Sequence, residues 1–235
     1  MVNVRKVYEA AYQNDRPNRK EIRITGWPKD RHQACIFWAG TGERVLDVGC
    51  GNGVVLYNLQ EHFRELHGTE FAFSRVISAR ETLKDLPAYV IQNNIEDGLP
   101  YPDTYFDTVI SAATIEHVVD VLYALKEMYR VLKPGGRLLL ITPNVAKLTN
   151  RLRLLLGKFP STSFDNEGVN FTHANVLMDG GHFHYFTYRS MRLFCQQAGF
   201  KPIYSYGIGT FGRLHQLWPK LLSGNIVLLA YRQKQ

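Results

Sequence analysis

The stretch Val45-Leu46-Asp47-Val48-Gly49-Cys50-Gly51-Asn52-Gly53 decides the fold, because it predicts a short buried strand that enters a helix through a glycine-rich turn. Glycine at positions 49 and 51 lets the backbone pass close to a bound ligand, and the start of the next helix offers free N–H groups. Dinucleotide-binding folds use a similar turn with the pattern G-x-G-x-x-G. Here Val54 occupies the third glycine position of that pattern, and Gly53 comes one residue early.

A carboxylate at the end of this strand narrows the choice of ligand. Asp47 would repel the pyrophosphate of a dinucleotide, whereas it would attract a ligand that carries an ammonium group. The turn therefore favours an amino-acid-like cofactor over a nicotinamide dinucleotide.

Strands and helices alternate through the first 142 residues. The sequence predicts strands at 44–48, 66–70, 89–91, 106–111 and 137–142 and helices at 55–63, 73–86 and 121–132. Asp120 is a suitable N-cap for the last of these helices, and Lys133-Pro134-Gly135-Gly136 would end it. This order predicts an α/β fold with a parallel sheet that is covered by helices on both faces.

The alternation ends after Pro143. Residues 143–186 show no clear period, and we interpret this long irregular stretch as a lid that faces the substrate. Thr187 would begin a helix that ends before Gly199, and residues 201–206 and 225–231 would form a final antiparallel pair at one edge. We expect one domain with four parts: an N-terminal cap (1–43), a cofactor-binding core (44–142), the lid (143–186) and a C-terminal helix with a strand hairpin (187–235).

Length and composition are those of a globular protein. The chain has 235 residues, of which 45% are hydrophobic and 21% charged, and no apolar run is long enough to span a membrane. No signal peptide is evident at the N-terminus. Its three widely spaced cysteines, Cys35, Cys50 and Cys195, favour a reducing, cytoplasmic location.

Charge is unevenly distributed along the chain. The net charge is +7, but residues 45–125 carry twelve acidic and four basic side chains, whereas residues 126–235 carry fifteen basic and four acidic ones. The basic C-terminal part could attract phosphates, an anionic membrane face or an acidic partner, or it could be an ordinary solvated surface.

The glycine turn resembles motif I of the class I S-adenosylmethionine-dependent methyltransferases, and the later elements follow that family in order. The similarity covers residues 40–142 and, more loosely, 182–231, in the subgroup called type 11 or type 23 methyltransferase domains. It implies a Rossmann-like fold with a seven-stranded, mostly parallel sheet. It also implies S-adenosylmethionine as the cofactor and S-adenosylhomocysteine as the product.

The resemblance also implies which residues hold the cofactor. Glu70 corresponds to the acidic residue that binds both ribose hydroxyls, and Phe71 would lie against the adenine. Asn94 and Ile95 belong to the segment that recognises the adenine edge, with Asn94 where most members have Asp. The remaining cofactor contacts would come from Asp47, Gly49, Cys50, Gly51 and Ser111.

Candidate catalytic and substrate residues come from three other segments. Glu116-His117 follows the fourth strand, where ligands bind in such sheets, and His117 could act as a base or could position the loop. The resemblance places Tyr8 and Tyr12 on a helix that folds over the cofactor, although simple core packing is an equal alternative for both. It also places His182 toward the substrate. His182 and His184 have no cysteine or carboxylate cluster beside them in the sequence, so we expect no metal.

The lid contains Asn150-Arg151-Leu152-Arg153-Leu154-Leu155-Leu156-Gly157-Lys158, in which basic and apolar residues alternate at near-helical spacing. Such a segment could contact a membrane surface, or it could bind a phosphorylated or lipid-linked acceptor through Arg151. We slightly favour a third interpretation, an ordinary helix that packs three leucines inward.

We therefore expect methyl transfer to a small molecule, with oxygen slightly favoured as the acceptor atom and a phosphorylated or lipid-linked glycan precursor as one candidate. Two alternatives stay open. One is a nucleic-acid methyltransferase, which the basic pI suggests but which lacks a motif for holding a flipped base. The other is a non-catalytic relative that assists a partner enzyme in biosynthesis.

Overall fold

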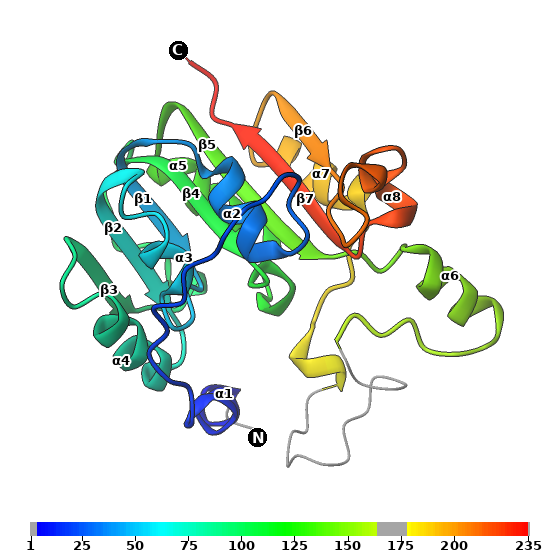
Figure 1. Ribbon diagram of the computed structural model, residues 1–235, viewed down its shortest axis with the longest axis horizontal. Helices are drawn as coiled ribbons and strands as arrows, with labels where there is room; N and C mark the ends of the chain where they lie inside the picture. Colours follow the sequence, from blue (N-terminus) through cyan, green and yellow to red (C-terminus); the bar gives the residue numbers. More distant parts are fainter. Residues whose placement is uncertain (1–3, 164–177, 235) are drawn as a thin grey trace.

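The computed structural model describes residues 4–163 and 178–234, and its centre is a seven-stranded sheet (Figure 1). The strands lie in the order β3-β2-β1-β4-β5-β7-β6, and β7 is antiparallel to both β5 and β6. Their bounds are β1 (Gly42–Val48), β2 (Phe63–Glu70), β3 (Ala88–Gln92), β4 (Phe106–Ala112), β5 (Leu132–Pro143), β6 (Ile203–Tyr206) and β7 (Asn225–Tyr231). The expected seven-stranded Rossmann-like sheet with an antiparallel final hairpin is confirmed.

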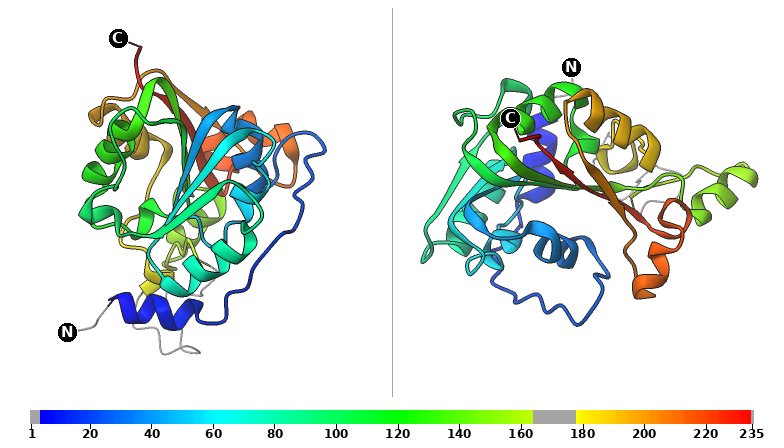
Figure 2. Two further views of the ribbon diagram at one scale, coloured as in Figure 1. Left: turned by 90° about the vertical axis from the view of Figure 1, so that its left-hand side faces the viewer. Right: turned by 90° about the horizontal axis from the view of Figure 1, so that it is seen from above.

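Helices cover both faces of the sheet, as the two views of Figure 2 show. The α-helices are α1 (Val4–Tyr12), α2 (Arg31–Ala39), α3 (Val54–Tyr57), α4 (Phe73–Thr82), α5 (Val121–Val131), α6 (Leu148–Leu155), α7 (Tyr188–Gln197) and α8 (Pro219–Leu222). Short 3-10 helices are η1 (Ile95–Asp97), η2 (Ile115–His117), η4 (Met178–Gly181) and η5 (Gly212–Gln216). No helix in these described ranges is long and apolar enough to cross a membrane.

Alternating side chains of the strands build two apolar layers. Leu46 and Val48 of β1 face one layer, which α5 and α7 complete. Val45 faces the other layer, which contains buried residues of α2, α3 and α4. This period of two is what a strand buried on both faces requires. The three cysteines are buried free thiols, two in the second layer and Cys195 in the first.

Two predicted helices are shorter than expected. The helix after the glycine turn has one turn only, α3, because the chain then turns and Phe63 begins β2 instead of extending the apolar stripe. Helix α4 ends at Thr82 and not near Leu86, and the following residues form a turn into β3. The helix caps were correctly predicted: Asp120 accepts a hydrogen bond from the N–H of Tyr123, and Thr187 forms a capping box with Ser190.

The stretch interpreted as an irregular lid contains a helix. Helix α6 extends from the body of the protein at the same end as α8 (Figure 1). Asn150 is its buried residue, and its amide donates to the carbonyls of Pro160 and Ser161. Leu152, Leu154 and Leu155 are all exposed, so the expectation that three leucines pack inward was wrong.

Candidate active site

A cavity of about 310 Å³ lies at the carboxyl ends of β1, β2 and β4, beside α1. Eight predicted site residues line it: Tyr8, Tyr12, Gly49, Glu70, Phe71, Asn94, Ile95 and His117. Six others do not: Asp47, Cys50, Gly51, Ser111, His182 and Arg151. The carboxyl ends of parallel strands are where open α/β sheets bind their ligands.

The glycine turn forms the floor of this cavity. The N–H groups of Gly49 and Cys50 both donate to the carbonyl of Thr69, which fixes the end of β1 against β2. Gly49 has φ 76°, and a Cβ atom there would overlap Oγ1 of Thr114. No side chain can therefore replace the hydrogen at this position without displacing the loop after β4.

The Glu70 carboxylate accepts three hydrogen bonds from backbone N–H groups. One of its carboxylate oxygens accepts from the N–H groups of Phe71 and Ala72, and the other accepts from Gly51 N at 2.9 Å. A carboxylate has about four lone-pair positions, so roughly one remains for a ligand. A ribose diol that bound through both hydroxyls would therefore have to take the place of one backbone N–H.

Arg75 is a cavity residue that the sequence analysis missed. Its guanidinium makes an ion pair with Asp15 at 3.0 Å, lies 3.9 Å from Glu70 and stacks over the ring of Tyr12. The sequence did hold a signal for Arg75. It is a cation five residues after Glu70, in a part of the chain with a net negative charge. Arg75 joins the N-terminal segment to the floor of the cavity.

Asp47 lies behind the glycine turn and not on the cavity wall. Its side chain is buried, and burial together with the nearby Glu70 raises its pKa to about 7, although Arg75 opposes this. The cavity therefore offers no direct contact with Asp47 for the ammonium group that the sequence suggested. Cys50 and Gly51 also lie in the turn without lining the cavity.

The end of the cavity next to β3 carries amide groups. Oδ1 of Asn94 accepts from the N–H of Glu96 and so caps η1. The neighbouring Asn93 donates to the carbonyl of Gly98, and its Oδ1 is buried without a partner among the described residues. Asn93 is therefore a better-placed acceptor for an exocyclic amine than the predicted Asn94.

The predicted cofactor contact of Ser111 does not fit the position of this residue at the end of β4. Ser111 is fully buried inside the sheet, and Ala113 and Thr114 line the cavity in its place. Ala113 has φ 58°, which turns the chain sharply out of β4. A contact to the methionine part of a cofactor would therefore come from residues two or three positions further along the chain.

His117 lies on the cavity wall with one ring nitrogen fully occupied. Its Nδ1 is 3.0 Å from the carbonyl of Gly181 and 2.8 Å from the hydroxyl of Tyr8. Because a carbonyl oxygen can only accept, Nδ1 carries the proton and Nε2 carries the lone pair. Burial, together with the neighbouring His182, lowers the pKa of His117 to about 4, so the ring is neutral at physiological pH.

Helix α1 closes the cavity from the outside. Glu9 on this helix accepts from the N–H groups of Phe73 and Ser74 and so caps the start of α4. Tyr8 packs edge-on against Phe71 at 5.7 Å, and Tyr12 lies 6.2 Å from Tyr8. Both tyrosines thus face the cavity.

His182 and Arg151 do not reach the cavity wall. The ring of His182 lies behind His117, with 4.8 Å between the ring centres, and Phe183 lines the cavity instead. Arg151 lies on the exposed helix α6 and donates to the carbonyl of Ala146. Phe183 is a cavity residue that the sequence analysis did not single out.

Comparison with known proteins identifies a matching family for the core of the chain. Residues 46–140 match the family described as a methyltransferase domain. The chain is 36% identical over 137 residues to the chloroplastic 2-phytyl-1,4-beta-naphthoquinone methyltransferase of Arabidopsis thaliana, covering 54% of this chain and 52% of that protein. It is 36% identical over 114 residues to the ubiquinone/menaquinone biosynthesis C-methyltransferase UbiE of Vibrio campbellii, covering 44% of this chain and 42% of that protein. The chain therefore spans about half the length of these curated relatives.

Solved structures share the fold over more of the chain. A SAM-dependent methyltransferase from Methanosarcina mazei superimposes with a TM-score of 0.63 at 19% identity, covering 88% of this chain and 100% of that one. One from Aquifex aeolicus gives 0.57 at 18% identity, covering 83% and 85%. Residues 46–140 therefore match a methyltransferase domain, and the chain as a whole has the fold of solved S-adenosylmethionine-dependent methyltransferases.

The cavity of this methyltransferase domain fits S-adenosylmethionine, its cofactor. Glu70 would hold the ribose through its remaining lone pair, and the unpartnered Oδ1 of Asn93 could accept from the adenine amine. The hydrogen of Gly49 leaves room above the turn. When bound, the cofactor supplies an electrophilic methyl group on a sulfonium.

We expect Glu70→Gln to weaken binding of S-adenosylmethionine by about 10- to 100-fold, because a hydrogen bond to a charged group contributes about 1.5–3 kcal/mol. Isothermal titration calorimetry measures this directly. The exposed Glu81→Gln is the control and should bind like the unmodified protein. Equal affinities of the two variants would contradict the role of Glu70.

Asp47→Asn should change stability in a pH-dependent way. The pKa of Asp47 is about 7 in the folded protein but about 4 in the unfolded chain. Between these pH values Asp47 is ionised in the unfolded chain and protonated in the folded protein, so the folded protein loses stability as pH rises from about 4 to about 7. The variant should therefore be more stable than the parent at pH 8, by up to about 2–4 kcal/mol, and equally stable near pH 4. Urea denaturation at both pH values tests this, with the exposed Asp97→Asn as control; a difference that does not vary with pH would exclude this explanation.

Proposed function

We propose that this protein transfers the methyl group of S-adenosylmethionine to a ring carbon of a small lipophilic acceptor that carries a ring hydroxyl, such as a quinol. The observation that carries the proposal is the composition of the cavity wall around His117. Val118, Val119 and Phe183 make this part apolar, and the neutral imidazole is a hydrogen-bonding group within it. An acceptor with an apolar ring and one hydroxyl suits such a surface.

The names of the curated relatives support this acceptor class. Both relatives described above are named for quinones, and one is named as a C-methyltransferase. Oxygen as the acceptor atom and a glycan precursor as the substrate find no support among them, and neither a nucleic-acid substrate nor a non-catalytic role is favoured.

His117 prepares the acceptor in the proposed reaction. Its Nε2 lone pair accepts the proton of the ring hydroxyl, because Nδ1 is held by Gly181. Ionisation of the hydroxyl raises electron density on the adjacent ring carbon, which forms the new carbon–carbon bond as the bond between methyl and sulfur breaks. The electron pair of that bond stays on sulfur, and the ring carbon then loses its hydrogen as a proton.

We also propose that α6 and α8 contact an anionic membrane surface, where such an acceptor would be found. Leu155 is 81% exposed and Leu217 is 79% exposed, and the same two segments carry further exposed apolar side chains: Leu152, Leu154, Leu156, Phe211, Leu214 and Trp218. We call these eight residues the α6–α8 surface. The described segments 143–163 and 201–234 contain no acidic residue, but they do contain Lys147, Arg151, Arg153, Lys158, Arg213 and Lys220. Apolar side chains flanked by basic ones are typical of interfacial membrane binding.

His117→Gln should lower kcat for methyl transfer by about 100-fold or more, because positioned proton transfer contributes roughly that much, while affinity for S-adenosylmethionine stays unchanged. The assay uses a prenylated 1,4-naphthoquinol kept reduced and follows S-adenosylhomocysteine and the methylated product by mass spectrometry. His62→Gln, at the amino end of β2, is the control. A product methylated on oxygen, or equal rates for the two variants, would overturn the proposal.

The membrane proposal predicts co-sedimentation with vesicles of phosphatidylcholine and phosphatidylglycerol, and much less with phosphatidylcholine alone. Replacing Leu152, Leu155 and Leu156 by Ser should weaken this binding by about tenfold or more, since burial of apolar area is lost. The matched control replaces three exposed apolar residues elsewhere, Ile77, Tyr89 and Leu193, by Ser. If both triple variants bind alike, the α6–α8 surface is not the contact.

A further inference from the structure

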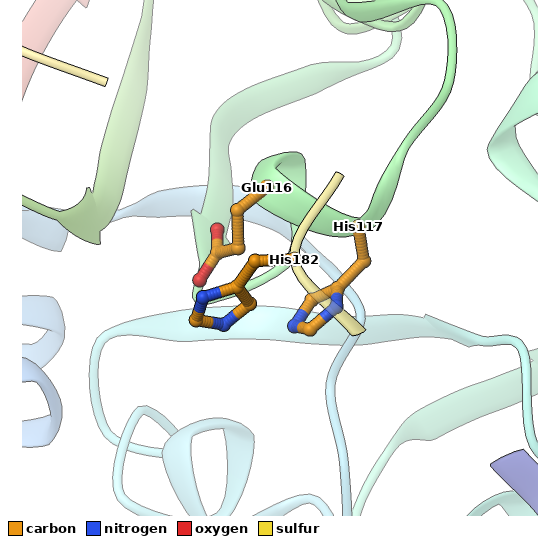
Figure 3. A group of neighbouring side chains, drawn as sticks. All are labelled: Glu116, His117 and His182. Atoms are coloured by element: carbon orange, nitrogen blue, oxygen red, sulfur yellow. The ribbon is translucent and has the colours of Figure 1, made fainter. Parts of the chain in front are cut away.

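Three side chains that can bind a metal meet behind the cavity wall. Glu116 and His117 come from η2, and His182 comes from the segment that follows η4 (Figure 3). One ligand atom from each residue lies within 4.8 Å of the other two. The sequence analysis found no carboxylate cluster beside His182 in the chain, and the fold brings Glu116 to it from a distant segment.

Glu116 has an unsatisfied oxygen in a buried position. The residue is 1% exposed, and one carboxylate oxygen accepts from the hydroxyl of Thr142 at 2.9 Å. The other oxygen, Oε1, is buried without a hydrogen-bond partner among the described residues. A buried carboxylate oxygen is costly unless it meets a donor or a cation.

His182 is held in the same tautomer as His117. The hydroxyl of Thr162 donates to the carboxylate of Asp179 at 2.8 Å, so it must accept from Nδ1–H of His182, which lies 2.7 Å away. Asp179 is fully buried and also accepts hydrogen bonds from Ser161 and Ser163. Nε2 of His182 is thus left with its lone pair.

This arrangement is the one that metal-binding histidines use. Such histidines donate their second N–H to a backbone carbonyl or, directly or through another group, to a carboxylate, which fixes the ring and its tautomer. His117 donates to the carbonyl of Gly181, and His182 donates toward Asp179 through Thr162. Nε2 of His117, Nε2 of His182 and Oε1 of Glu116 have no hydrogen-bond donor among the described residues, and one ligand atom of each side chain lies within 4.8 Å of the other two.

We propose that Glu116, His117 and His182 bind a divalent first-row transition-metal ion, with Zn²⁺ as the reference ion. Two histidines and one carboxylate are a donor set that suits such ions and leaves at least one coordination position open. Ligand atoms around Zn²⁺ lie roughly 3.3–3.5 Å apart, so the ligand atoms, which lie within 4.8 Å of one another, would have to approach by up to about 1.5 Å. Small side-chain rotations about the fixed backbone of η2 can supply this.

The metal site deepens the proposed function and, in its catalytic role, rests on it. His117 is the one proposed ligand among the three that also lines the cavity, and in a catalytic role the ion's open position would be reached by the acceptor beside this residue. The acceptor's hydroxyl oxygen would bind there, its O–H bond would break, and the proton would pass to water. In the metal-loaded protein the ion, and not Nε2 of His117, would ionise the acceptor.

Metal binding is measured on the full chain without an affinity tag that contains histidine. We expect about one equivalent of Zn²⁺ to remain after dialysis, by inductively coupled plasma mass spectrometry. Competition with a chromophoric chelator gives the affinity, and Glu116→Gln and His182→Gln should each weaken it at least 100-fold. His184→Gln is the matched control, because His184 bonds to the carbonyl of Val119 and should leave Zn²⁺ affinity unchanged.

Two further measurements keep the result interpretable. The near-ultraviolet circular dichroism of each variant shows whether it is folded, and the absorption spectrum of the Co²⁺ form separates nitrogen and oxygen ligands from the buried thiols. Loss of binding in both folded Gln variants but not in His184→Gln supports the site even if no methyl transfer is found. Failure of the unmodified protein to retain Zn²⁺, or equal affinity in all variants, would overturn it even if methyl transfer is found.

Discussion

The glycine turn after β1 is the constraint on which the rest of the site depends. Gly49, Gly51 and Gly53 all have positive φ, at 76°, 57° and 81°, a conformation that other residues adopt only with strain. The turn directs two N–H groups to Thr69 and a third to Glu70. It therefore sets both the register between β1 and β2 and the direction in which the Glu70 carboxylate points.

Electrostatics around this turn favour a cationic ligand. Two carboxylates, Asp47 and Glu70, lie close together in a largely buried region, and their proximity contributes to the raised pKa of Asp47. Arg75 offsets part of this repulsion, but its guanidinium also forms an ion pair with Asp15. These carboxylates would attract a positively charged sulfonium in the cavity more strongly than the neutral thioether that is left after methyl transfer.

The sequence predicted the parts of the structure that depend on local signals. The parallel core with helices on both faces follows from the alternation of elements, and the positions of Gly49, Glu70 and His117 follow from their places at strand ends. Positions that depend on side-chain direction were not predictable in this way. Ser111 and Asp47 occur in strands, and the pleat turns both away from the cavity, so that Ala113 and Thr114 take part instead.

Long-range contacts were the other source of error. Glu116 and His182 are more than sixty residues apart, and they come together because the N–H groups of Phe183 and His184 both donate to the carbonyl of Glu116. The side to which helix α6 turns its apolar residues was not predictable for a related reason. Its apolar positions fit an inward-facing helix as well as a surface one, and only its place at the end of the molecule exposes them.

His117 links two segments that lie outside the parallel core. The hydroxyl of Tyr8 in the N-terminal helix and the carbonyl of Gly181 both meet its Nδ1. The positions of Tyr8 on α1 and of the carbonyl of Gly181 are therefore coupled to the tautomer of the ring. If the carbonyl of Gly181 moves away, Nδ1 can accept from Tyr8, and the proton shifts to Nε2, which then has no lone pair for an acceptor or an ion. The backbone at position 181 can thus control the chemistry of the cavity without lining it.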